Sequence, residues 1–166
     1  MLLETTPQAA EALFRALAGL SLWGAGRIEL PEDAEPFFMG EHPHIPTAPL
    51  IEVITQPLEA GAVSQRLVAQ TLAAVGLAHL TPLLSTVSNW EEELALEDQQ
   101  RIAFARALLQ KPRWILMHEA ASALSNEAEA NLLDLLLREL PASALIVITH
   151  RAPESRFERR IVIAGR

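Results

Sequence analysis

The fold is decided by residues 94–125, which read LALEDQQRIAFARALLQKPRWILMHEAASALS. Within this stretch we expect a helix over residues 97–110 that ends before Pro112, because proline cannot continue a helix. The apolar run over residues 114–117 then predicts a strand that is buried on both faces. A helix followed directly by such a strand favours a parallel sheet with helices on its faces.

The same alternation continues toward the C-terminus. We expect a helix over residues 126–140, a buried strand over 144–148 and a shorter strand over 160–164. Apolar side chains at helical spacing predict the inner face of the helix. That face should carry Leu132, Leu133, Leu136 and Leu137.

Toward the N-terminus, residues 1–3 look like the end of a strand. Thr6 and Pro7 then predict a helix start, with threonine as the cap and proline at the first helical position. Further short strands are expected over residues 27–30 and 37–39. The N-terminal part therefore contributes strands and one helix to the same sheet.

The middle of the chain, from about residue 50 to 106, has helical character. Gly76 predicts the end of one of its helices. We interpret the chain as an α/β core of residues 1–50 and 105–166, with a helical subdomain inserted over residues 51–104. The inner face of the helix before Gly76 should carry Val63, Leu67, Thr71, Leu72 and Val75.

Composition excludes several classes of protein. The chain has 166 residues, half of them hydrophobic and a fifth charged, which fits one globular domain. A net charge of −8 without a basic run argues against nucleic acid as the main partner. The absence of cysteine excludes disulfides and thiolate metal sites. No apolar stretch reaches the roughly 18 residues of a spanning helix, so we expect no direct membrane insertion.

Four motifs in order resemble those of the ATP-binding domain of ABC transporters. Residues 94–106 are similar to the signature motif and its helix, and residues 111–120 to the second ATPase motif. Residues 121–125 resemble the dimer-contact loop, and His150 falls where the switch histidine lies. Residues 13–20 and 23–28 are typical of the subgroup fused to membrane segments, the peptide-uptake and peroxisomal fatty-acyl half-transporters. Upstream, the family's antiparallel strands and adenine-stacking aromatic are missing, so the chain looks N-terminally truncated.

The resemblance implies a P-loop NTPase-like (RecA-like) three-layer core with a mainly parallel sheet and an ABC-type helical subdomain. In the family a glycine-rich loop with a lysine cradles the phosphates. The matching positions here are residues 4–12, which contain no glycine. Ala10 stands where the lysine should be and Glu11 where the magnesium-binding hydroxyl should be. Glu4 and Glu11 are interpreted instead as ordinary acids near a helix N-terminus.

The other nucleotide-facing positions depart in the same direction. Glu41 occupies the position of the glutamine that would contact magnesium and the attacking water. In the signature, Ala95 and Glu97 replace serine and glycine, and Gln99 completes the nucleotide-facing set. Glu97 and Asp98 should lie in the first helical turn, where carboxylates complement the helix dipole. Two further replacements are His118 for the aspartate of the magnesium shell and Ser125 for the aspartate of the dimer-contact loop.

Two residue types of the family's catalytic machinery remain. Glu119 fits the general base and His150 the phosphate sensor. We interpret both as inactive, because neither can act without a magnesium-loaded nucleotide. His118 is interpreted as a neutral histidine at a strand end. A zinc site would pair it with Glu119 or with the group Glu41, His42 and His44, but nothing local fixes such a geometry.

The function expected is that of a degenerate ABC nucleotide-binding domain, non-hydrolysing, that pairs with or regulates another ABC-type domain in a transport system. Its partners would be such a domain, either a second copy or an active homologue, and a transporter membrane domain. Its location would be cytoplasmic, at the inner face of a membrane through that transporter. No cofactor is expected, although the family uses ATP and magnesium. The alternatives are an ABC-type ATPase with residual ATP binding and hydrolysis, and an altered, non-natural sequence whose site was erased.

Overall fold

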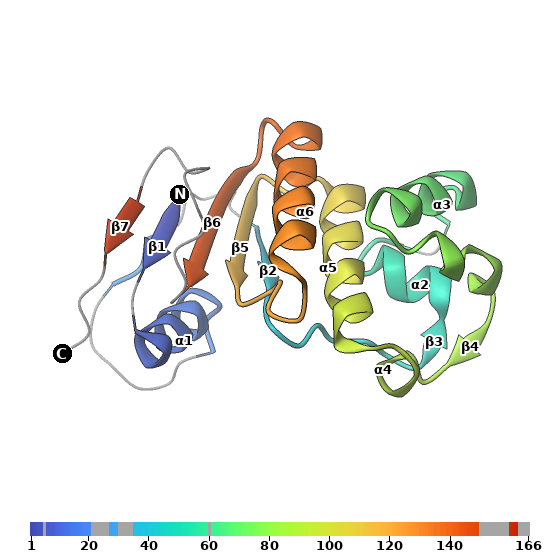
Figure 1. Ribbon diagram of the computed structural model, residues 1–166, viewed down its shortest axis with the longest axis horizontal. Helices are drawn as coiled ribbons and strands as arrows, with labels where there is room; N and C mark the ends of the chain where they lie inside the picture. Colours follow the sequence, from blue (N-terminus) through green and yellow to red (C-terminus); the bar gives the residue numbers. More distant parts are fainter. Residues whose placement is uncertain (5, 21–26, 30–34, 60, 150–159, 163–166) are drawn as a thin grey trace. The chain divides into compact units, whose positions relative to one another are not determined.

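Five strands, all paired in parallel, form the main sheet of the computed structural model (Figure 1). Their order across the sheet is β2-β5-β6-β1-β7. The structure describes residues 1–4, 6–20, 27–29, 35–59, 61–149 and 160–162. The α/β class with a mainly parallel sheet is thereby confirmed. The strands are β1 (Leu2–Glu4), β2 (Pro36–Met39), β5 (Trp114–His118), β6 (Ala144–Thr149) and β7 (Arg160–Val162).

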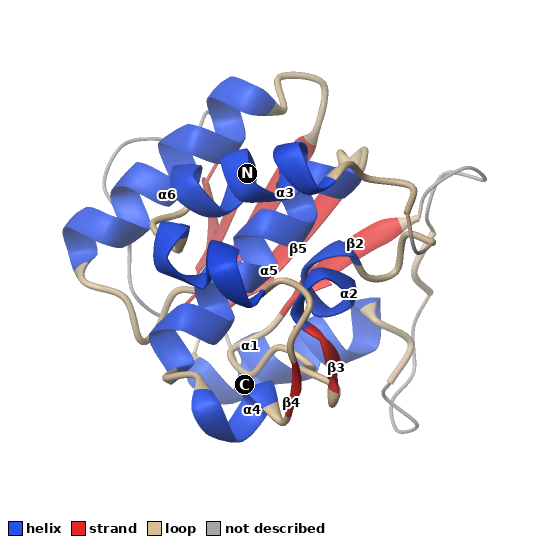
Figure 2. Cartoon of the chain, turned by 90° about the vertical axis from the view of Figure 1, so that its right-hand side faces the viewer, coloured by secondary structure: helices blue, strands red, loops and turns tan. Residues whose placement is uncertain are grey.

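The chain's contacts divide it into two compact units. The first comprises residues 1–40, 112–119 and 142–166 and contains the five-stranded sheet and helix α1 (Pro7–Leu17). The second comprises residues 41–111 and 120–141. It contains α2 (Leu50–Thr55), α3 (Gln65–Ala74), the 3-10 helix η1 (Ala78–Leu83), α4 (Trp90–Glu93), α5 (Leu96–Gln110), α6 (Asn126–Glu139) and a small sheet of β3 (Ala48–Pro49) and β4 (Val87–Ser88) (Figure 2). The division expected from the sequence, with the helical part confined to residues 51–104, stays a prediction.

In the first unit, the apolar run of β5 is buried as its composition predicts. Ile115, Leu116 and Met117 are each no more than 3% exposed. Helix α1 begins where Thr6 and Pro7 indicate, because the Thr6 hydroxyl accepts a hydrogen bond from the Ala9 amide. Its inner face packs against β6, where Ala10 and Ile148 form a fully buried pair. This packing fixes the start of α1 over the sheet.

In the second unit, helix α5 is buried on most of its faces. It contacts α2, α3 and α6, and its buried residues include both apolar and polar types. Ile102 and Phe104 are fully buried, and so is Gln100. A helix buried all round loses the amphipathic pattern of a surface helix. The polar side chains must then find partners inside the unit.

Three details of the sequence prediction are wrong. Residues 27–29 form no strand, and Ile28 is 50% exposed; Leu30 lies outside the described residues. Leu67 and Leu137 are 46% and 41% exposed, although both were assigned to inner faces. The inner faces carry Val68 and Leu135 instead. Apolar spacing indicates a helix, but it does not fix which edge of the apolar stripe is covered by neighbouring elements.

The end of helix α3 agrees with the sequence prediction. Gly76 follows α3 with a φ of +85°, as a helix-ending glycine should. Trp90 is buried, and its indole donates a hydrogen bond to the Ala48 carbonyl, whereas Trp114 is half-buried. Over the described ranges, no helix is both long and apolar enough to cross a membrane.

Candidate functional site

The segment that should cradle phosphates is the first turn of an ordinary helix. The Thr6 carbonyl accepts a hydrogen bond from the Ala10 amide at 2.8 Å, so that amide is engaged within the helix. The Ala9 amide is engaged by the Thr6 side chain at 3.4 Å. Ala10 itself is 0% exposed against Ile148. The position that would carry a phosphate-binding lysine therefore holds a methyl group in the core of the first unit.

Glu11 and His118, which stand at two positions that bind magnesium in the family, contact each other. His118 Nδ1 lies 3.4 Å from Glu11 Oε2. The imidazole is 9% exposed and stacks on Phe14, with ring centroids 5.4 Å apart. Arg15, one turn further along α1, lies 3.7 Å from the other oxygen of the same carboxylate. The histidine is thus held by a carboxylate and an aromatic ring, in agreement with a structural strand-end residue.

One interpretation of Glu11 needs correction. The first turn of α1 contains no acidic side chain, so Glu11 does not complement the positive end of that helix. Glu11 lies one turn later and engages His118 instead. Glu4 belongs to strand β1, outside the helix. The sequence placed these acids correctly near the helix start, but the tertiary contact decides what the carboxylate of Glu11 does.

Glu119 follows β5 directly and adopts a backbone conformation that is rare for its type. Its φ is +51°, in the left-handed region that favours glycine. Such a conformation costs on the order of 1 kcal/mol for a residue with a Cβ atom and is often found at functional sites. His150 lies outside the described residues. The catalytic roles assigned to Glu119 and His150 stay predictions.

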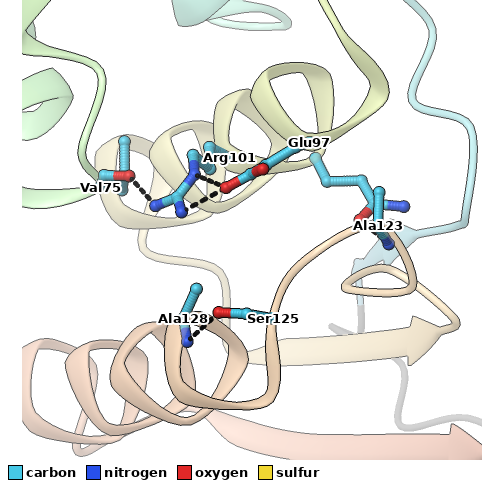
Figure 3. A network of polar contacts seen from close by, with 7 residues as sticks. Val75, Glu97, Arg101, Ala123, Ser125 and Ala128 are labelled. Carbon is cyan, nitrogen blue, oxygen red and sulfur yellow. Dashed lines mark hydrogen bonds and ion pairs between the residues drawn. The ribbon is translucent and has the colours of Figure 1, made fainter.

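The start of α5 carries the two carboxylates expected in its first turn, Glu97 and Asp98. Ala95 is the N-cap residue and supplies no side-chain hydrogen bond. Arg101 binds the Glu97 carboxylate at 2.7 Å and also donates to the Val75 carbonyl at 2.8 Å (Figure 3). The signature position that would be glycine in the family is therefore occupied by one half of an intrahelical ion pair.

Gln99 and Gln100 use their side chains for different segments of the second unit. Gln99 is 8% exposed and donates hydrogen bonds to the carbonyls of Glu91 and Leu94, both at 2.9 Å. The Gln99 amide is thus bound to α4 and to Leu94, the segment that precedes α5. Nothing in the contacts of Gln99 points to a nucleotide, and its assignment to the nucleotide-facing set stays a prediction.

Gln100 was not singled out by sequence reasoning. Its side chain is 0% exposed and donates to the Glu41 carbonyl at 3.0 Å and to the Ser122 hydroxyl at 2.9 Å. Its side-chain oxygen accepts a hydrogen bond from the Ala123 amide at 3.0 Å. Glu41 and the loop of residues 120–125 are thereby joined through α5. No clear signal for it was present in the sequence, because Gln100 is flanked by Gln99 and Arg101 in the polar first half of α5.

Arg106 is a second buried polar residue that the sequence did not reveal. Its guanidinium donates to the carbonyls of Val53 and His44 at 2.8 and 2.9 Å. Within the described part of the chain, its third nitrogen, Nη2, has no hydrogen-bond partner. Burial lowers the pKa of Arg106 to about 10, because desolvation disfavours the charged form. His44 thus contributes its backbone carbonyl to this contact. Among the described residues, no cluster of three His, Asp or Glu side chains could hold a metal ion.

No model of a known protein family matches the chain. Several curated proteins are similar to the chain in sequence. Over 140 residues the chain is 32% identical to an uncharacterized ABC transporter ATP-binding protein of Haemophilus influenzae, covering 84% of this chain and 24% of that protein. An uncharacterized ABC transporter ATP-binding protein of Synechocystis is 34% identical over 152 residues, with coverage of 90% and 23%.

A third relative is ATP-binding cassette sub-family D member 1 of Drosophila melanogaster, which is 26% identical over 162 residues. The match covers 91% of this chain and 22% of the fly protein. The chain therefore spans about a quarter of the length of these three relatives.

Proposed function

This chain is a homologue of the ATP-binding domains of ABC transporters, the D-subfamily half-transporters among them, and from that relationship we propose that it is a degenerate, non-hydrolysing member that pairs with another such domain. The observation that carries this proposal is the start of α1. There the expected phosphate loop is replaced by a capped helix whose lysine-equivalent residue, Ala10, is buried in the core.

The residues in the magnesium positions do not fit a Mg–ATP complex. Magnesium prefers oxygen ligands in octahedral geometry. Two of the residues at these positions are the carboxylate of Glu11 and the imidazole of His118, which already contact each other. We therefore derive no hydrolytic step through a bound nucleotide for this chain.

The signature region supports the same conclusion for the second composite site. In the family, the site of each domain is completed by the signature of the other. A phosphate approaching the start of α5 would meet the carboxylate of Glu97, which is about half exposed. Arg101 offsets part of this charge, so the repulsion of the phosphate is smaller than the roughly 4 kcal/mol between two unpaired unit charges about 4 Å apart at an effective dielectric near 20. A chain of this kind would weaken both composite sites of a pair, so a pairing or regulatory role is favoured over asymmetric catalysis.

By the same proposal, the partners are an ABC-type domain, either a second copy or an active homologue, and the membrane domain of a transporter. The location that follows is cytoplasmic, at the inner face of the membrane. The rival function is residual ATP binding and hydrolysis. The left-handed conformation of Glu119 favours that rival, because such strain is often retained where a residue acts in chemistry.

Titration with a fluorescent ATP analogue and magnesium separates the two functions. We expect no saturable binding tighter than about 100 μM, which corresponds to roughly 5.5 kcal/mol of binding free energy. The Glu119→Gln variant should behave like the parent chain. Saturation below that concentration, together with phosphate release that Glu119→Gln abolishes, would establish the ATPase alternative.

A further inference from the structure

Gln100 joins three separate segments of the second unit through one side chain. The segments are the backbone at Glu41, helix α5 itself, and the loop of residues 120–125, which we call the 120–125 loop. Both hydrogens of its amide group and its oxygen are used, at distances between 2.9 and 3.0 Å. Full burial removes water as a competitor for these bonds.

The 120–125 loop is held at two points. Gln100 binds Ser122 and Ala123 in its middle, and Ser125 caps α6 at its end. The Ser122 hydroxyl lies in addition 3.5 Å from the Glu41 carboxylate. Ser122 and Ala123 lie within a turn that is closed by a hydrogen bond from the Leu124 amide to the Ala121 carbonyl. Figure 3 shows the loop leading from Ala123 to the start of α6.

We propose that Gln100 is a positioning residue that fixes the 120–125 loop in one conformation. The loop would then present its contact residues to a partner domain without the ordering that ATP could provide. The presentation of the loop to a partner domain rests on the proposed function, whereas the contacts of Gln100 are observed independently of it. A neighbouring glutamine gives a matched comparison, because the Gln99 amide donates to the carbonyls of Glu91 in α4 and of Leu94, away from the 120–125 loop.

Amide hydrogen exchange of the whole chain, resolved by NMR at single residues, tests the proposal. In Gln100→Met we expect the Ala123 amide to exchange about tenfold faster, as the loss of one or two hydrogen bonds predicts. Gln99→Met should leave Ala123 unchanged and accelerate exchange only near the start of α5. Gln100→Glu retains an oxygen for the Ala123 amide but loses the donor to the Glu41 carbonyl and buries a charge, so exchange at Ala123 should fall between that of Gln100→Met and that of the parent chain.

An unchanged exchange rate of Ala123 in Gln100→Met would overturn the proposal. So would equal acceleration in Gln99→Met, because that result would indicate a general loosening of α5. If Gln100→Met fails to fold, Ser122→Ala removes one contact from the loop side without altering the buried helix. It should accelerate exchange within residues 120–125 by about twofold to threefold, and an unaffected loop would again overturn the proposal.

Addition of millimolar Mg–ATP to the parent chain separates this inference from the proposed function. We expect no change in exchange at residues 120–125. Protection that appears only with ATP would show that the chain binds nucleotide and would contradict the expected lack of ATP binding. The effect of Gln100→Met in the nucleotide-free chain would still decide the role of Gln100 by itself.

Discussion

Adjacent residues of one type have different partners in this protein. Gln99 and Gln100 are neighbours on α5, yet one binds the turn before the helix and the other binds Glu41 and the 120–125 loop. Successive residues of a helix point about 100° apart, so the surroundings of each position decide its contacts. Residue identity therefore sets what each side chain is able to bind, and position in the fold sets what it does bind.

The buried methyl group of Ala10 leads to a prediction at this scale. Restoring the family's lysine with Ala10→Lys should lower the free energy of unfolding by about 3 kcal/mol or more, because an ammonium group would be buried without a partner. Gln8→Lys, on an exposed position of the same helix, should change it by less than about 0.5 kcal/mol. Urea unfolding of both variants measures the difference. Equal stability of the two variants would contradict the burial of position 10 in the core of the first unit.

At the scale of elements, the helix starts explain how motif residues could be exchanged without loss of the fold. Ser125 stands where the family has aspartate, and its hydroxyl accepts a hydrogen bond from the Ala128 amide at 3.2 Å. Serine and aspartate are both effective N-cap residues. The exchange therefore preserves α6 while it removes a charge from the loop before it.

This exchange can be tested by thermal or urea unfolding. Ser125→Ala should lower the free energy of unfolding by about 1 kcal/mol, as the loss of an N-cap does. Ser125→Asp should stay within about 0.5 kcal/mol of the parent, because the new charge favours the helix end but meets Glu127 and Glu129 in the first turn. Ser85→Ala, at an exposed position, serves as the control. A loss in Ser125→Asp as large as in Ser125→Ala would contradict the capping role.

At the scale of the whole molecule, net charge restricts the partners. The chain carries −8 at pH 7. Binding to nucleic acid gains most of its free energy from cations that neutralise phosphates. We therefore expect no retardation of duplex DNA or single-stranded RNA in gel-shift assays at about 0.15 M salt with micromolar protein, where non-specific binders already show complexes. A complex that weakens steeply with added salt would show that a basic surface exists after all.

The sequence by itself determined the main helices and strands of the α/β part and their order along the chain. The spacing of apolar residues and the residues that begin or end a helix are local signals. They located α5, β5, α6 and β6, and also the cap of α1 at Thr6 and the end of α3 at Gly76. The order of the motifs over residues 94–125 likewise indicated the family. Where local signals were weak, as over residues 27–29, the strand prediction was wrong.

Only the tertiary structure decided which polar groups meet. The pairing of Glu11 with His118, the three bonds of Gln100 and the carbonyl partners of Arg106 join residues far apart in the chain. Half of the acceptors, at Glu41, Val53 and His44, are backbone carbonyls, which every residue possesses and which leave no trace in the sequence. Burial then makes these bonds necessary, since a buried polar group without a partner is costly.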